Sequence, residues 1–185
     1  MSTKSILLGL SGKSGSGKSS AAAYLEREHG FIPLAFADIL KEAAQGILYF
    51  SAEQLEGSLK EIPDSRFGKS PRWCLQHLGS ACREIWPEVW IWPVCRQIIQ
   101  LQDWGEKRLL VSDVRLGNEA KALKRLGAVL WRLERPGIAG AEGGIPGYAS
   151  ETELDFSGGW DLVIANDGSL ERLYMALDIY LDDLV

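Results

Sequence analysis

The feature that most constrains the fold is the segment GKSGSGKS, residues Gly12–Ser19, which matches the pattern GxxxxGK[ST] in full. It follows Ser5–Leu10, a short apolar segment typical of a buried strand. It runs into Lys18–Glu28, where small and apolar residues recur at helical spacing and would form an inner face (Ala21, Ala22 and Leu25). In this order the glycines let backbone N–H groups curl around an anion, and the helix directs its positive end to the same place. The segment therefore predicts a phosphate-binding loop.

This loop, called the P-loop below, predicts a binding site for a nucleoside triphosphate. Lys18 would reach the β- and γ-phosphates, and the Ser19 hydroxyl would bind Mg²⁺. The residues expected to bind ATP here are Gly12, Lys13, Ser14, Gly15, Ser16, Gly17, Lys18, Ser19 and Ser20.

Strand and helix patterns alternate along the rest of the chain. Further strands are expected at Phe31–Phe36, Leu109–Ser112, Ala128–Leu133 and Asp161–Ala165. Further helices are expected at Asp38–Phe50, from Pro71 to near Trp86, and at Val94–Trp104, Glu119–Leu126 and Ser169–Leu184. Residues 60–70 are rich in charge and turn formers and predict a loop. Such alternation predicts a three-layer α/β/α fold around a central parallel sheet of about five strands.

We expect one P-loop kinase domain over residues 1–185, whose core is formed by residues 1–37, 105–133 and 160–185. Residues 38–104 are too many for a simple crossover and would form a helical insertion over the carboxyl edge of the sheet, where ligands bind in open α/β folds. Residues 134–159 are rich in Gly, Pro and Ser, and their length predicts a mobile lid.

Other classes of P-loop protein fit the chain less well. A GTPase would carry DxxG after its third strand and NKxD further on, but Leu116 stands three residues after Asp113, and residues 166–168 read Asn-Asp-Gly. An ATPase motor would be larger and would carry an acidic pair at its metal-binding strand. A small kinase that acts on a nucleotide or another small metabolite is the favoured class.

Charge and hydropathy exclude several partners. The chain has 20 Lys and Arg against 25 Asp and Glu, a net charge of −5. From Glu151 to Val185 there are nine acidic residues and one basic residue, so the first 150 residues carry a net +3. No broad positive face for nucleic acid is expected, although a local cleft could hold small polyanions. Ile6–Leu10 is too short for a membrane span or a signal peptide, so we expect no membrane partner.

Three cysteines, Cys74, Cys82 and Cys95, have no CxxC spacing. They are expected to be small buried residues on helices, in a reducing cytoplasm.

Basic residues gather in the insertion and after the predicted strands: Lys41, Lys60, Arg66, Lys69, Arg72, Arg83, Arg115, Arg132 and Arg135. An acceptor that is itself a phosphate needs cations to hold it near ATP, and the guanidinium fork binds phosphate through two hydrogen bonds. Arg66 is therefore a candidate for binding the acceptor. Arg115 and Arg135 directly follow strands and are candidates for stabilising the transferring phosphoryl group.

The ordered set of motifs resembles the deoxynucleoside monophosphate kinases of tailed bacteriophages. The similar segments are the P-loop, Phe36-Ala37-Asp38 with Lys41, Ser70-Pro71-Arg72 with Leu75-Gln76-x-Leu78-Gly79 and Arg83, Asp113-Val114-Arg115 with Asn118-Glu119, and Asn166-Asp167-Gly168-Ser169-Leu170. They cover nearly the whole chain. The resemblance implies phosphoryl transfer from ATP to a deoxynucleoside monophosphate, with Mg²⁺, on the core, acceptor and lid architecture of monophosphate kinases.

The resemblance also implies a role for individual residues. Asp38 would lie beside the acceptor as a catalytic residue, and Lys41 would lie near the acceptor phosphate. Arg72, Gln76 and Arg83 would line the acceptor pocket, and Glu119 would face it. Asp113 would act through the hydration shell of Mg²⁺, Arg115 would contact phosphates, and Arg135 would join from the lid. Asn166 and Asp167 would lie where related kinases pass the adenine of ATP along the backbone.

Seven tryptophans are many for 185 residues, and five of them lie in the insertion: Trp73, Trp86, Trp90, Trp92 and Trp104. We interpret them as large side chains that fill a thin core or form a homodimer interface. Trp73 adjoins Arg72 and is the candidate for stacking on an acceptor base.

Two alternatives stay open. A dephospho-coenzyme A kinase shares the P-loop and an Asp after the second strand, but its acceptor is a hydroxyl, so Asp38 would be a required general base. A non-catalytic protein could instead use ATP to organise a partner surface through the tryptophans.

Overall fold

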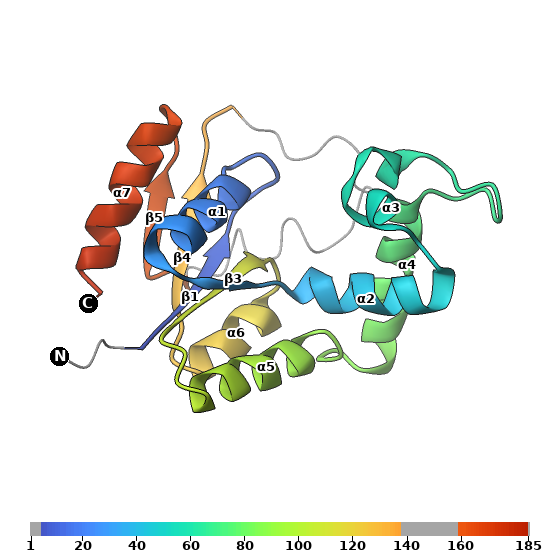
Figure 1. Cartoon of the computed structure of the whole chain (residues 1–185), viewed down its shortest axis with the longest axis horizontal. Coiled ribbons are helices and arrows are strands. Elements are labelled where there is room, and N and C mark those ends of the chain that lie inside the picture. Colours follow the sequence, from blue (N-terminus) through green and yellow to red (C-terminus); the bar gives the residue numbers. More distant parts are fainter. Residues whose placement is uncertain (1–4, 138–158, 185) are drawn as a thin grey trace. The chain divides into compact units, whose positions relative to one another are not determined.

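The computed structural model describes residues 5–137 and 159–184, and it contains a five-stranded parallel sheet (Figure 1). The strands are β1 (Ile6–Ser11), β2 (Ile32–Leu34), β3 (Arg108–Val114), β4 (Val129–Glu134) and β5 (Leu162–Ala165). They are ordered β2-β3-β1-β4-β5, and every neighbouring pair is parallel. β1 therefore lies in the middle of the sheet, and all six of its residues are buried.

Helices cover both faces of this sheet. Leu8 and Leu10 of β1 pack in one cluster with α1 (Lys18–His29) and α7 (Leu170–Asp182). Gly9 points to the opposite face, where a Cβ would lie 3.3 Å from the Leu123 side chain of α6 (Gly117–Arg125). Neighbouring residues of a strand point to opposite faces, so α1 and α7 form one outer layer and α6 belongs to the other. The expected three-layer α/β/α fold is confirmed.

The chain divides into two compact units. The first, the sheet unit, is drawn from residues 1–35 and 95–185, and the second, the helical unit, is Phe36–Val94. The helical unit contains α2 (Phe36–Leu48), α3 (Ala52–Glu56), the 3₁₀ helix η1 (Ser58–Glu61) and α4 (Pro71–Ile85). Its core is built from Ala44, Phe50, Leu55, Cys74 and Leu75. The sequence predicts an insertion over 38–104, and most of the predicted lid, residues 138–158, lies outside the described residues.

All the predicted helices and strands are present, but some bounds differ. The strand expected over Phe31–Phe36 covers only Ile32–Leu34, and Phe36 begins α2. The last long helix before β3, α5 (Ile91–Asp103), begins three residues before the predicted Val94. Pro93 is compatible with this start because it lies in the first turn, where its missing N–H would have no helical partner.

Only one of the five tryptophans in residues 73–104 is buried. Trp90 is 5% exposed, and its Nε1 donates a hydrogen bond of 3.1 Å to the Gly79 carbonyl. More than a third of the surface of Trp73, Trp86, Trp92 and Trp104 is exposed. Filling a thin core therefore explains Trp90 but not the other four. The proposed homodimer interface stays a prediction.

Across residues 5–137 and 159–184, no helix combines the length and the apolar character that crossing a membrane requires.

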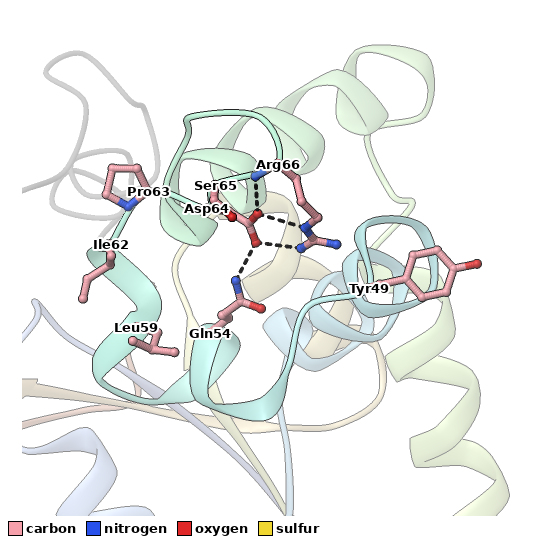
Figure 2. Close-up of a pocket in the computed structure, with 8 residues that line it drawn as sticks. All are labelled: Tyr49, Gln54, Leu59, Ile62, Pro63, Asp64, Ser65 and Arg66. Carbon is pink, nitrogen blue, oxygen red and sulfur yellow. Dashed lines mark hydrogen bonds and ion pairs between the residues drawn. The ribbon is translucent and has the colours of Figure 1, made fainter.

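Asp64 organises the loop between η1 and α4. Its carboxylate accepts hydrogen bonds from the Arg66 backbone N–H (2.9 Å), from Arg66 Nε (2.8 Å) and Nη2 (2.7 Å), and from Gln54 Nε2 (2.7 Å) (Figure 2). Arg66 Nη1 also donates to the Leu48 carbonyl at 2.7 Å, so the guanidinium ties the loop to the end of α2. These hydrogen bonds, first among them those from the Arg66 side chain, hold the pKa of the Asp64 carboxyl well below its usual range.

We expect Asp64→Asn to lower the thermal unfolding midpoint at pH 7 by several degrees, because it removes a carboxylate with four donors. A carboxyl whose pKa is lowered by folding stabilises the protein above its ordinary pKa of about 3.9, and this contribution is lost as the pH falls toward the lowered value. The difference between variant and unchanged protein should therefore be constant from pH 7 to about pH 5 and shrink below about pH 4.

Unfolding followed by circular dichroism over this pH range checks the prediction. Asp103→Asn, at the exposed end of α5, removes the same charge and should follow the unchanged protein. An unfolding difference for Asp64→Asn that persists unchanged to pH 2.5 would contradict it.

Candidate phosphoryl-transfer site

The P-loop is a tight turn between the end of β1 at Ser11 and the start of α1 at Lys18. Gly12 has a φ of 143° and Gly17 a φ of 102°, values that side-chain-bearing residues rarely adopt. A Cβ at Gly12 would overlap the Leu133 carbonyl oxygen of β4, and a Cβ at Gly17 would overlap the side-chain amide of Asn166, which follows β5. Glycine is therefore required at both positions by backbone angle and by space. The turn is seated against the ends of two other strands.

The first turn of α1 offers backbone N–H groups to an anion. Its N-cap is Gly17, so no side chain caps the helix, and no acidic residue lies in its first turn. The twelve residues of α1 are enough to give a helix dipole whose positive end lies at this loop. The N–H groups of a helix's first turn have no partners within the helix, and together with the dipole they favour a phosphate at this point.

Lys18 lies across the same turn. Its Nζ donates hydrogen bonds to the carbonyl oxygens of Gly12 and Lys13, the latter at 2.8 Å. These two hydrogen bonds place the ammonium group at the loop. A phosphate bound to these N–H groups would be within reach of the flexible Lys18 side chain.

Several of the predicted site residues lie at the same edge of the sheet. Asp113 lies near the end of β3, and Arg115, Arg135 and Asn166 directly follow β3, β4 and β5. Because the strands are parallel, their carboxyl ends meet at one edge, which is also where β1 enters the P-loop. β3 extends to Val114, two residues beyond the expected end, so Asp113 lies within the strand, and Val114 pairs with Ser11. Arg115 and Arg135 are both exposed.

Glu119 has a role that was not predicted from the sequence. It is 3% exposed, and its Oε2 accepts hydrogen bonds from the backbone N–H groups of Arg115 (2.7 Å) and Leu116 (2.9 Å). The carboxylate thus holds the turn between β3 and α6, and with it the backbone of Arg115. The available signal was a Glu three residues after the N-cap position, Leu116. Contact between Glu119 and an acceptor stays a prediction.

The oxygen donors at this edge fit Mg²⁺. Ser19 contributes an exposed hydroxyl and Asp113 a half-buried carboxylate, and oxygen is the ligand that Mg²⁺ prefers. Within the part of the chain that the structure describes, no cluster of three or more His, Cys, Asp or Glu is arranged to hold a metal. Nucleotide sites do not require such a cluster, since Mg²⁺ there is held by one or two protein groups together with the phosphates.

The helical unit contains a group of cations, Lys41, Lys60 and Arg72, which we call the basic cluster. Lys41 Nζ contacts Asp38 Oδ1 at 2.9 Å and Glu56 Oε1 at 2.5 Å, and Arg72 Nε pairs with Glu61. Burial alone would lower the pKa of Lys41, but the hydrogen bonds to Glu56 and Asp38 outweigh it and raise this pKa. Burial lowers the pKa of Lys60, and the positive charges of Arg72 and Lys41 lower it further. The carboxylates of Glu56 and Glu61 act in the opposite direction, so Lys60 lies among charges of both signs.

One face of α4 carries the remaining predicted acceptor residues. Arg72, Gln76 and Arg83 are spaced at four and seven residues along the helix and are all half-buried. Trp73 does not present a bare ring, since it stacks on His77 with centroids 3.6 Å apart, and Lys69 Nζ lies 4.9 Å from its centroid. An acceptor base that stacks on Trp73 would therefore have to share or displace these neighbours.

A pocket of about 430 Å³ lies in the helical unit beside Arg66 (Figure 2). Its lining is Tyr49, Gln54, Leu59, Ile62, Pro63, Asp64, Ser65 and Arg66. Arg66 is hydrogen-bonded to Asp64 and to the Leu48 carbonyl, and Gln54 to Asp64 and to the Ser51 N–H. These polar side chains of the wall are therefore already hydrogen-bonded within the helical unit. Arg66 therefore organises this loop, and its predicted contact with the acceptor stays a prediction. No pattern in the sequence signals the pocket, because it depends on how short segments fold back.

Comparisons with known proteins agree with this geometry. No protein-family model matches the chain. A protein of Acanthamoeba polyphaga mimivirus, described as "Putative deoxynucleotide monophosphate kinase", is 35% identical over 182 residues, which cover 91% of this chain and 92% of that protein.

Solved structures share the fold at lower identity. The dephospho-CoA kinase of Campylobacter jejuni superposes with a TM-score of 0.57 at 12% identity, covering 96% of each chain. A sugar kinase from Janibacter sp. superposes with a TM-score of 0.56 at 17% identity, covering 96% of this chain and 95% of that one. With the P-loop seated at the edge of a five-stranded parallel sheet, these similarities show that the chain is a phosphotransferase of the P-loop kinase fold and belongs to the deoxynucleotide monophosphate kinase family.

Proposed function

We propose that the protein transfers the γ-phosphoryl group of ATP to a deoxynucleoside monophosphate, giving the deoxynucleoside diphosphate and ADP. The observation that carries the proposal is the P-loop with Lys18 lying across it. Asp113, Arg115 and Arg135 lie at or directly after the carboxyl ends of strands at the same edge of the sheet. Membership of the kinase family supports the same reaction class. We place the reaction in the cytoplasm, that of the host if the chain is viral, since none of Cys74, Cys82 and Cys95 forms a disulfide.

Different residues of the sheet unit bind different parts of ATP. The N–H groups of the P-loop and the Lys18 ammonium bind the β- and γ-phosphates, and the adenine lies beside the backbone of Asn166 and Asp167. Ser19, and Asp113 through water, would hold Mg²⁺, which neutralises phosphate charge when bound. Arg115 and Arg135 face the transferring group, whose oxygens carry the developing charge.

The helical unit supplies the acceptor side of the proposal. The basic cluster of Lys41, Lys60 and Arg72 binds the acceptor phosphate, and Trp73, Gln76 and Arg83, on α4, contact the rest of the nucleotide. An oxygen of the acceptor phosphate attacks the γ-phosphorus as the bond to the β-phosphate oxygen breaks, and ADP leaves. That oxygen is already ionised at neutral pH, so Asp38 positions the acceptor through Lys41 and need not remove a proton.

The first test measures ADP release from ATP and Mg²⁺ in the presence of dAMP, dCMP, dGMP, dTMP or dephospho-CoA. We expect at least one deoxynucleoside monophosphate to stimulate release, and Lys18→Ala to reduce the stimulated rate more than about a hundredfold. Lys121→Ala, at an exposed position on α6, is the matched control and should behave as the unchanged protein.

Stimulation by dephospho-CoA alone would replace the proposal with a kinase that acts on a hydroxyl, and Asp38→Asn should then be severely impaired. Slow hydrolysis that none of the five compounds stimulates would refute both kinase functions. It would favour an ATP-gated binding protein.

A second prediction concerns the basic cluster. Lys60→Gln and Arg72→Gln should each raise the KM for the acceptor about tenfold, because each removes a charge-assisted contact with phosphate, and should leave the KM for ATP unchanged. Lys121→Gln, which removes the same charge from α6, should change neither constant. Equal increases in both KM values would argue that the cluster does not bind the acceptor.

Trp73→Ala should raise the acceptor KM about tenfold and leave the KM for ATP alone, because a stacked base loses its platform. Trp73→Phe keeps an aromatic face and should recover most of the loss. If ATP and acceptor are affected alike, Trp73 supports the helical unit and does not bind the base.

A further inference from the structure

We propose that Asn166 is a positioning residue for nucleotide binding, whose side-chain amide sets the direction of a P-loop N–H group. The inference rests on the proposed binding of ATP at the P-loop. It assigns the Asn166 side chain a task separate from the adenine contact proposed for its backbone.

The contact is a buried hydrogen bond between two distant parts of the chain. Asn166 Nδ2 donates to the Ser16 carbonyl at 3.0 Å, across a sequence separation of 150 residues. Asn166 is 5% exposed and Ser16 is 2% exposed, so water does not compete for either group. A carbonyl oxygen can only accept, so the amide nitrogen has to be the atom that faces it. A buried carbonyl without this donor would be costly.

This hydrogen bond orients a whole peptide group. The Ser16 carbonyl and the Gly17 N–H belong to one planar trans peptide, in which C=O and N–H point in opposite directions. Holding the carbonyl against Asn166 therefore turns the Gly17 N–H away from β5, to the other side of the loop. The Ser16 N–H is separately bonded to the Lys13 carbonyl at 3.1 Å, so the peptide groups on both sides of Ser16 are restrained.

Asn166 is itself fixed from two sides. Its backbone N–H donates to the Glu134 carbonyl at 2.7 Å, which extends the pairing of Glu134 with Ala165 between β4 and β5. Three residues later Ser169 caps α7, accepting from the Arg172 N–H at 3.4 Å. A Cβ at Gly17 would overlap the Asn166 amide and lie 3.5 Å from Leu173 of α7. The amide therefore fills the space that the glycine leaves open.

The test is ATP binding, measured by calorimetry with ATP and Mg²⁺ at pH 8 and pH 5.5, for the unchanged protein and for Asn166→Asp. An ionised carboxylate cannot donate to the Ser16 carbonyl and repels it, so at pH 8 the variant should bind ATP at least about tenfold more weakly. Burial beside a carbonyl raises the pKa of such a carboxyl, and its protonated form donates a hydrogen bond. At pH 5.5 the deficit relative to the unchanged protein should shrink to within about threefold.

Gln97→Glu is the matched control, since it makes the same amide-to-acid change at an exposed position of α5 and should show no deficit at either pH. An Asn166→Asp variant that binds ATP normally at pH 8, or whose deficit is the same at both pH values, overturns the inference. If the unchanged protein itself fails to bind ATP, the proposed function has failed and Asn166 is not at issue.

A second variant covers the case in which Asn166→Asp does not fold at pH 8. Asn166→Ala should then raise the KM for ATP about tenfold and leave the acceptor KM unchanged. A merely structural role would reduce the amount of active protein and so the apparent kcat, with both KM values kept. An unchanged KM for ATP overturns the inference as well.

Discussion

The close seating of the β1–α1 turn against the ends of β4 and β5 is the constraint on which the site depends. β1 is central and fully buried, so the turn that follows it begins at the middle of the sheet edge. Gly12 meets the backbone of β4, and Gly17 meets Asn166 after β5. With no side chain on either glycine, the backbone itself becomes the binding surface. The positive end of α1 and the Lys18 ammonium then act on whatever anion the backbone admits.

Exposed ion pairs in the helical unit hold its cations in place, and replacing them with a phosphate would cost little free energy. Lys41 is paired with Asp38 and Glu56, and Arg72 with Glu61, and the acidic partners are all more than half exposed. Such pairs contribute little to stability, so a doubly charged phosphate can replace a carboxylate without a large loss. The pair of Asp64 with Arg66 differs, because the Asp64 side chain is 7% exposed and shares four donors. It is suited to shaping a loop and poorly suited to exchanging partners.

Periodicity and glycine spacing predicted most of the fold. The strands and long helices were expected because each is long enough to repeat an apolar pattern, and the P-loop because its motif lies between a strand and a helix. α3 and η1 have five and four residues, too few to show a period. The overall charge of −5 was a weak guide, since the cations that matter are local.

The contacts of individual buried side chains were less accessible from the sequence. Glu119 could be assigned to a site by its position after β3, but only the structure shows it holding the turn before α6. Asn166 could be placed beside ATP from its motif, but the amide contact with Ser16 joins segments whose proximity no local pattern encodes. In both cases the missing information was which backbone group a buried side chain reaches.

The contact between Asn166 and Ser16 also bears on how the protein is made. Ser16 is synthesised 150 residues before Asn166, which directly follows β5. A nascent chain can form β1 and α1 beforehand, yet its nucleotide loop lacks this restraint until Asn166 has been synthesised. Binding of ATP during synthesis would therefore be weak until β5 and Asn166 have been added, and truncation before Asn166 would leave a loop with the right sequence and an unfixed peptide plane.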